Sequence, residues 1–275
     1  MGENLPDSVF VEDNGYLLPT DLAKGPWYPG TQHGSSMMGL MAWGVEQHDS
    51  DIPRQVVRLT VDMMKALPMA AVEIKSTTHN KGRYVEVVDV SLWSEGKEYV
   101  RGSALRFRTD DVPLSPGYDS QEQITLPSKP QRSIFANVSV GIGFHSAFEY
   151  RTDFAHEQTA LWLRLTRPLV AGFEITPFQR VAVAADWTYS VPNIRLSFTE
   201  GKGFEDHAFV GINPDTTINL HQPLQGEWVG LKSRVSYGGV GAGTVSAQLF
   251  GEQGAAVGFS SQSVLLRRNK LNSPG

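Results

Sequence analysis

The stretch that most constrains the fold lies near the end of the chain, between residues 213 and 268. It contains three runs in which apolar and polar residues alternate, a period typical of strands with one buried face. Turn signals separate the runs, at Gly226, at Gly238–Gly239 and at Glu252–Gly254. The pattern predicts a meander of long antiparallel strands.

The first half of the chain repeats this arrangement after an apolar segment. Residues 35–45 are apolar on almost every side, which predicts a helix that is buried rather than one that lies on a surface. Gly39 and Gly44 weaken such a helix unless other groups pack closely against it, so we expect close packing there. Strand-like alternation then runs from residue 55 to residue 110.

The second half begins after a segment of different composition. Residues 111–140 contain four prolines and show no period, so we interpret them as a linker between units at 1–110 and 141–275. Strand patterns return after residue 141. Thr176 and Pro177 then form an N-cap followed by proline at the first helical position, which predicts a helix over about 178–187. Residues 193–206 are expected to be a loop.

An internal repeat links the two halves. The segment Val90–Glu95 resembles Ala247–Glu252, and in this register Ala104 occupies the place of Gln262. A sheet curled round one buried helix and present twice predicts an α+β double hotdog, with two antiparallel sheets joined edge to edge. This position is polar only in the second copy. Gln262 is therefore a better candidate for a site residue than a polar residue that both copies share.

Composition excludes several classes of function. The chain has no cysteine, so a disulfide framework, a zinc site with cysteine ligands and a thiol nucleophile are excluded. A net charge of −5 provides no basic surface, so we expect no nucleic-acid partner. No apolar run approaches the roughly 18 residues that span a membrane, and no signal peptide is evident, so we expect a cytoplasmic protein. The dispersed histidines predict no metal site, and no cofactor motif is present.

The chain resembles the double-hotdog acyl-CoA thioesterases of type II. The resemblance is strongest from Glu227–Trp228 to Arg267, where a Glu-Trp pair, a hydroxyl residue, glycines, a glutamine and an arginine follow in the family's order. The segment from Gly25 to Gly34 is also similar to thioesterase relatives. This resemblance implies hydrolysis of acyl-CoA to a free acid and CoA, without a cofactor and in fatty acid metabolism.

The resemblance also implies site residues. In the family a carboxylate, a hydroxyl residue and a glutamine orient the water that attacks the thioester. These positions fall on Asp215, Ser236 and Gln262, which we therefore expect to converge as the catalytic residues. From the residues alone, Asp215 could equally be a turn residue before a strand, and Gln262 could face outward.

The start of the first helix is the predicted oxyanion and substrate-binding region, formed by His33, Gly34 and Ser35. Free backbone amides at a helix start favour a carbonyl oxygen or an anion. His33 itself is expected to cap the helix. We interpret Asp186, at the end of the second helix, as a surface charge.

Two further functions stay open from the sequence. The chain could be a hotdog enoyl-thioester hydratase or dehydratase, which would need a histidine paired with a carboxylate near a helix start. It could also bind acyl thioesters without turnover. By analogy with other hotdog proteins, we expect a homo-oligomer, a dimer of double hotdogs.

Overall fold

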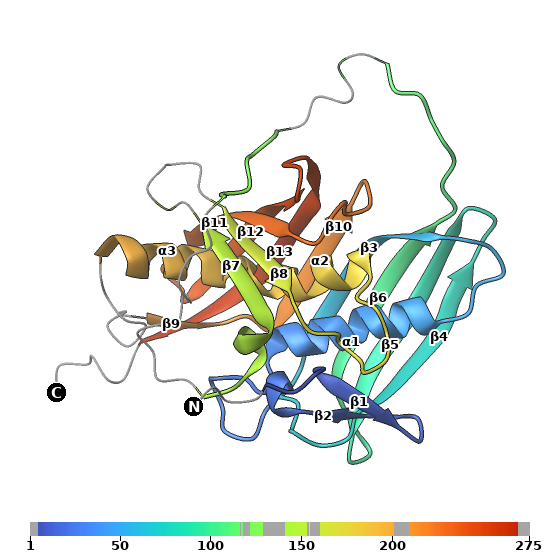
Figure 1. Ribbon diagram of the computed structural model, residues 1–275, viewed down its shortest axis with the longest axis horizontal. Coiled ribbons are helices and arrows are strands. Elements are labelled where there is room, and N and C mark those ends of the chain that lie inside the picture. Colours follow the sequence, from blue (N-terminus) through green and yellow to red (C-terminus); the bar gives the residue numbers. More distant parts are fainter. Residues whose placement is uncertain are drawn as a thin grey trace.

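The computed structural model describes residues 5–115, 117, 122–128, 141–152, 154, 160–200 and 209–268. Within these residues, eleven strands form one antiparallel sheet in the order β4-β5-β6-β3-β10-β13-β12-β11-β8-β7, with β9 paired to β13 (Figure 1). The predicted α+β class is confirmed, since a large antiparallel sheet is combined with few helices.

The strands of the sheet follow the two predicted meanders. Their bounds are β3 Gln55–Met63, β4 Glu73–Lys81, β5 Val85–Ser94, β6 Lys97–Phe107, β7 Phe148–Thr152, β8 Leu161–Leu165, β9 Phe209–Ile212, β10 Asp215–Leu220, β11 Val229–Tyr237, β12 Ala242–Gly251 and β13 Ala256–Arg268. A small separate sheet pairs β1 Phe10–Asp13 with β2 Tyr16–Pro19.

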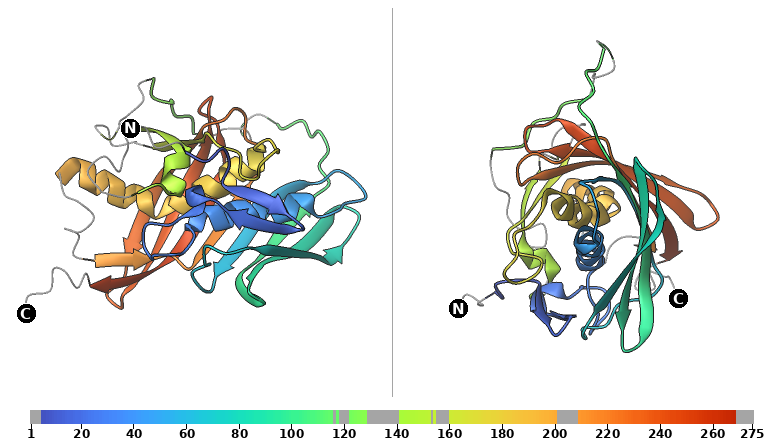
Figure 2. Two further views of the ribbon diagram at one scale, coloured as in Figure 1. Left: turned by 60° about the horizontal axis from the view of Figure 1, so that its bottom comes forward. Right: turned by 90° about the vertical axis from the view of Figure 1, so that its right-hand side faces the viewer.

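Helices occupy the concave side of the large sheet, which curves round them (Figure 2). Their bounds are α1 Gly34–Gln47, α2 Pro177–Ala185 and α3 Ser190–Glu200, with 3-10 turns η1 Asp21–Ala23, η2 Phe144–Ala147 and η3 Asp186–Thr188. α1 and α2 pack against each other in opposite directions, because Ser35 at the start of α1 meets Asp186 after the end of α2, whereas Glu46 near the end of α1 meets Thr176 at the start of α2.

The two halves of the sheet join along β3 and β10. This junction is antiparallel, with Thr60 opposite Thr217 and Asp62 opposite Asp215. Each strand covers what would otherwise be the open edge of the other, so backbone groups that would attract another chain are paired inside the molecule. The junction makes one continuous sheet from the two meanders.

The predicted burial of the first helix is confirmed. Residues 35–45 of α1 are all buried. A Cβ atom on Gly39 would lie 2.7 Å from Leu169 Cδ1, and one on Gly44 would lie 2.6 Å from Ile74 Cγ2. Both glycines therefore allow the close packing for which a larger residue has no room.

The second helix begins as predicted, but the chain beyond it does not. Thr176 caps α2 by accepting a hydrogen bond from the Gln179 amide, and Pro177 is the first helical residue. The predicted loop is wrong over residues 193–200, because α3 continues to Glu200. Pro192 is tolerated there because it lies in the first turn of α3, where backbone amides have no partner within the helix. Residues 201–206 lie outside the described residues.

The predicted linker lies partly outside the described residues. Its described parts contain no named helix or strand, and one isolated bridge pairs Gln123 with Ala255.

Candidate active site

A buried carboxylate lies where the two halves of the chain meet. Asp186 follows α2 directly and is only 7% exposed. Its side chain faces the first residues of α1, which come from the other half. A carboxylate that is removed from water favours its protonated form, and burial accordingly raises the pKa of Asp186 to about 6. Asp186 is thus poised to exchange a proton near neutral pH.

Hydrogen bonds from both halves fix the Asp186 carboxylate. Ser35 Oγ donates to Asp186 Oδ2 at 2.9 Å, and Asn213 Nδ2 donates to Oδ1 at 3.2 Å. These donors favour the ionised form and lower the pKa, but desolvation is the larger effect. Each carboxylate oxygen therefore has at least one fixed donor, which holds the carboxylate in one orientation.

Gln262 lies beside Asp186 on the inner face of β13. Its side chain is 2% exposed. Gln262 Nε2 donates to the Asp186 backbone oxygen at 3.1 Å and to Thr216 Oγ1 at 2.9 Å, while Oε1 accepts from the Tyr189 amide at 2.8 Å. The amide thus bridges β10 and the α2–α3 connection, and it holds the backbone that carries Asp186.

A second contact ties this connection to β13. The hydroxyls of Thr188 and Ser260 lie 2.5 Å apart, and both residues are fully buried. Two side chains of one strand therefore fix the segment 186–189 with three hydrogen bonds. This explains how a short turn between two helices can hold a carboxylate in one position.

His33 caps α1 in its neutral form. Its Nδ1 accepts a hydrogen bond from the Ser35 amide at 3.0 Å, so the expected capping role is confirmed. Burial lowers the pKa of His33 to about 4. Nδ1 also lies 3.6 Å from Asp186 Oδ2. This approach is not an ion pair, because Nδ1 accepts a hydrogen bond from the Ser35 amide and the ring is uncharged near neutral pH.

The backbone of Gly34 also lies close to the carboxylate. A Cβ atom at this position would lie 2.7 Å from both oxygens of Asp186. Within the part of the chain that the structure describes, the Gly34 amide has no acceptor, as is usual for the first amides of a helix. The start of α1 therefore brings an amide without an acceptor close to a buried carboxylate.

Two known family models match this chain. Residues 23–107 match the acyl-CoA thioesterase N-terminal domain, and residues 118–266 match the acyl-CoA thioesterase C-terminal domain. The chain belongs to the acyl-CoA thioesterase family. It is a thioesterase, as the sequence resemblance predicts.

Solved structures of similar fold include known thioesterases. Acyl-CoA thioesterase II TesB2 from Mycobacterium marinum has a TM-score of 0.62 at 13% identity, over 88% of this chain and 91% of that chain. The tesB protein of Mycobacterium avium subs paratuberculosis has a TM-score of 0.62 at 13% identity, over 93% and 95%. A conserved protein of unknown function with a hot dog fold from Alicyclobacillus acidocaldarius reaches 0.70 at 12% identity, over 98% of both chains. At these identities the similarity shows the fold, a hotdog fold. The comparison with curated proteins found no match.

The predicted catalytic residues Asp215, Ser236 and Gln262 do not bond to one another in the hydrogen bonds of the described residues, and their catalytic role stays a prediction. Gln262 and Ser263 are consecutive on β13, so their side chains lie on opposite faces of the sheet. Asp215 Oδ1 accepts from the Ser263 amide at 2.7 Å, next to the exposed Ser263 side chain, whereas Gln262 points inward to Thr216. Asp215 thus lies on the outer side, away from Gln262.

Ser236 shares the outer position of Asp215. On β11 it is exposed and lies opposite the exposed Thr244 of β12, which in turn pairs with Ser263. Asp215 and Ser236 are therefore separated by two intervening strands, β12 and β13, on the face that carries no helix. Neither side chain contacts the buried carboxylate.

The predicted residues His33, Gly34 and Ser35 lie beside the Asp186 side chain, and Gln262 donates to the Asp186 backbone oxygen. The residue that brings them together is Asp186, whose interpretation as a surface charge is wrong. The sequence contains one signal for it, since Asp186 follows the apolar run Val181–Ala185 and precedes Trp187. A carboxylate between buried apolar residues is more often buried than one at a polar helix end.

No helix in the described residues is long and apolar enough to cross a membrane. Over the same residues, no group of three or more histidine, aspartate or glutamate side chains could hold a metal ion.

Proposed function

We propose that this thioesterase hydrolyses acyl-CoA with Asp186 as the general base. The observation that carries the proposal is the buried Asp186 carboxylate, fixed by Ser35 and Asn213 and adjacent to the free amide of Gly34. A base is most effective when its pKa lies near the working pH, and a pKa of about 6 leaves Asp186 mostly ionised at neutral pH.

In the proposed reaction, Asp186 takes one proton from a water molecule as the water oxygen attacks the thioester carbonyl carbon. The carbonyl electron pair moves onto its oxygen, which becomes an oxyanion. When the C=O bond re-forms, the C–S bond breaks and the thiolate leaves. The proton held by Asp186 passes to sulfur, so the products are the free acid and CoA.

The oxyanion would be stabilised by the Gly34 amide at the start of α1. A helix N-terminus carries a partial positive charge, which adds to the hydrogen bond. Removing one such donor typically lowers the rate by about 10²–10³. This assignment keeps the role that the sequence predicts for residues 33–35.

Gln262 is proposed as a positioning residue as well as a contact for the water. Both Nε2 hydrogens are already used, by Asp186 O and Thr216 Oγ1, so only Oε1 has a free lone pair. Gln262 could therefore accept a hydrogen from the attacking water, but it could not donate one without breaking a bond to its own protein.

The test is thiol release from a panel of acyl-CoA substrates. Asp186→Asn should reduce the rate by at least about 10²-fold, the usual effect of removing a general base. Asp215→Asn is the matched control, because it makes the same change at the outer carboxylate and should leave the rate within about twofold. If Asp215→Asn abolishes turnover and Asp186→Asn does not, the proposed base is wrong.

A hydratase or dehydratase is the second candidate, because a histidine and a carboxylate lie close together, with 3.6 Å between His33 Nδ1 and Asp186 Oδ2. The low pKa of His33 makes it a weak base, which favours hydrolysis. Hydration of an enoyl-CoA without thiol release would support the second candidate.

We also propose that the hotdog fold is double, with units at 1–110 and 141–275 that each contribute one part of the sheet and one central helix, α1 or α2. The cytoplasmic location, the role in fatty acid metabolism and the assembly as a dimer of double hotdogs stay predictions. Cell fractionation, the acyl-CoA panel and light scattering would test them in turn.

A further inference from the structure

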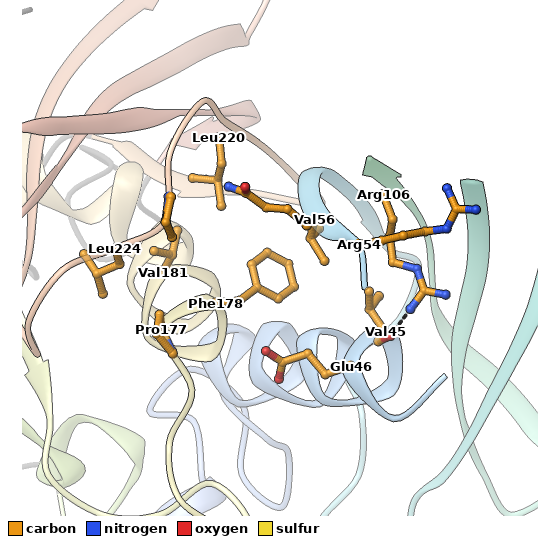
Figure 3. A pocket seen from close by; sticks show the side chains of 12 residues that line it. Val45, Glu46, Arg54, Val56, Arg106, Pro177, Phe178, Val181, Leu220 and Leu224 are labelled. Carbon is orange, nitrogen blue, oxygen red and sulfur yellow. Dashed lines mark hydrogen bonds between the residues drawn. The ribbon is translucent and has the colours of Figure 1, made fainter. Parts of the chain in front are cut away.

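A pocket lies at the opposite ends of the two central helices from Asp186. Its volume is about 310 Å³, within the usual range for small-molecule pockets. The lining comprises Val45, Glu46, Arg54, Gln55, Val56, Arg106, Pro177, Phe178, Val181, Leu220, Pro223 and Leu224 (Figure 3). Ser35 and Glu46 are 11 residues apart on α1, so roughly 16 Å of helix separates the pocket from the Asp186 site.

The lining of this pocket is mainly apolar, with Phe178 projecting into its centre (Figure 3). Glu46 is its half-buried carboxylate. Thr176 Oγ1 donates to Glu46 Oε1 at 2.6 Å, and Gln179 Nε2 donates to Oε2 at 2.7 Å. Burial raises the pKa of Glu46, so its charge is disfavoured.

The two arginines of the lining are held by another carboxylate. Arg106 Nη2 lies 2.6 Å from Glu86 Oε2, and Arg54 Nε lies 3.5 Å from the same oxygen. Figure 3 shows both guanidinium groups turned away from Phe178. Both arginines face Glu86, and burial disfavours the charge of Glu46, so the pocket suits an uncharged apolar group rather than an ion.

The arrangement round Glu46 repeats that round Asp186. In both places a carboxylate near the end of one central helix accepts a hydrogen bond from a hydroxyl at the start of the other, Ser35 for Asp186 and Thr176 for Glu46. The antiparallel packing of α1 and α2 creates these two equivalent ends.

The repeat lacks two groups that hydrolysis would need. Pro177, at the start of α2, has no amide hydrogen for an oxyanion. Ala104 occupies the place of Gln262 in the internal repeat, and it pairs with Leu59, whereas Gln262 bonds to Thr216. The second end of the helix pair therefore has an open apolar pocket but lacks the amide donor and the glutamine of the Asp186 end.

We propose that this pocket is a second acyl-binding site, which holds the apolar chain of an acyl thioester without hydrolysing it. The identity of the ligand rests on the proposed function, because the duplicated end of the helix pair is expected to take the same class of molecule. The proposal predicts two molecules of acyl thioester per chain, one at each end of the helix pair.

The test counts bound ligands on the full chain by isothermal titration calorimetry. The probes are S-octyl-CoA and S-dodecyl-CoA, thioethers that carry the chain but have no thioester to hydrolyse. The wild type should bind two molecules per chain. Val56→Trp, which fills the pocket from a partly exposed position on β3, should bind one and keep its thiol-release rate within about twofold.

Val11→Trp is the control, because it introduces the same side chain at a position that is 43% exposed on β1, and it should still bind two. Leu220→Trp fills the same pocket from β10 and replaces Val56→Trp if that variant does not fold. One molecule per chain in the wild type, or two in the filled variants, would overturn the proposal. Failure of the proposed hydrolysis would appear separately, as unchanged thiol release in Asp186→Asn.

Discussion

Gly34 and Asp186 approach each other so closely that no side chain fits between them. A Cβ atom on Gly34 would lie 2.7 Å from Asp186 Oδ1 and Oδ2 and 2.9 Å from Cγ. The two residues come from different halves of the chain, one at the start of α1 and the other after α2. Only glycine at position 34 lets the start of α1 lie this close to the carboxylate.

Gly34→Ala should therefore impair turnover more than folding. The new methyl group displaces the Asp186 carboxylate from its position beside the amide, and a small misplacement of reacting groups can cost about 10²-fold in rate. Thiol release and the melting temperature are measured together. Gly239→Ala is the control, because a Cβ atom there meets nothing within 4 Å. Equal activity in both variants would rule out a reaction next to Gly34.

The pH dependence of kcat/KM should follow the ionisation of Asp186. The base acts in its ionised form, so activity should fall as the pH drops through about 6 and level off above it. His33 should add no second limb in this range, because its pKa is about 4. A pH–rate profile from about pH 4 to about pH 9 checks this, and an inflection that survives in Asp186→Asn would assign it to another group.

Asp186→Asn should stabilise the protein at neutral and alkaline pH. The folded-state pKa of about 6 lies above the ordinary value of 3.8, so the folded state binds the Asp186 proton more tightly than the unfolded state does. That stabilisation is complete below pH 3.8 and is lost as the pH rises through 6. Above this pH window, burial of the ionised Asp186 lowers the free energy of unfolding by roughly 3 kcal/mol. Asparagine carries no charge and avoids this loss. Urea unfolding at about pH 8 and about pH 4 should show a gain only at the higher pH.

Gln262→Ala should lower both stability and activity. The substitution leaves the Tyr189 amide, the Asp186 carbonyl and the Thr216 hydroxyl without their partner in a buried region. Each orphaned group costs about 1–3 kcal/mol, so unfolding should occur at clearly lower urea concentration. Ser263→Ala on the outer face is the control. Unchanged stability in Gln262→Ala would show that water replaces the amide.

Asp215→Ala and Ser236→Ala should both retain thiol release within about twofold of the wild type. Both side chains lie on the outer face, and Asp215 contacts only the Ser263 amide in the hydrogen bonds of the described residues. Asp215→Ala removes that bond, but it also removes the repulsion between Asp215 and Asp62, which lie directly opposite each other. The two effects oppose each other, so the free energy of unfolding should change by less than about 1 kcal/mol. A hundredfold loss of rate in either variant would show that the reaction takes place on the outer face.

The fold could be predicted from the sequence because its signals are local. Alternation of apolar residues predicts the meanders, and Thr176–Pro177 predicts the start of α2. The repeat register that places Ala104 with Gln262 also depends only on local similarity. The continuation of the chain as α3 was missed, because Pro192 is a helix breaker except in a first turn, and the pattern does not reveal where the first turn is.

The site could be predicted only in part because its residues meet through tertiary packing. Gln262 and residues 33–35 stand in segments with recognisable patterns. Asp186 does not, since its burial depends on α1 packing against the α2–α3 connection. Asp215 precedes Thr216 by one residue, and in a strand that single step moves a side chain to the other face. A motif read along the chain cannot distinguish the two faces unless the register is known.

The contact between Ser35 and Asp186 joins residues 151 positions apart in the sequence. Closing so long a loop is slow compared with forming a hairpin, so this contact forms late in folding. An N-terminal half that leaves the ribosome first has Ser35 and Gly34 but no carboxylate to face them. Thioester hydrolysis therefore requires that both halves have been synthesised and have docked. Recovery of activity is a direct probe of the final stage of refolding.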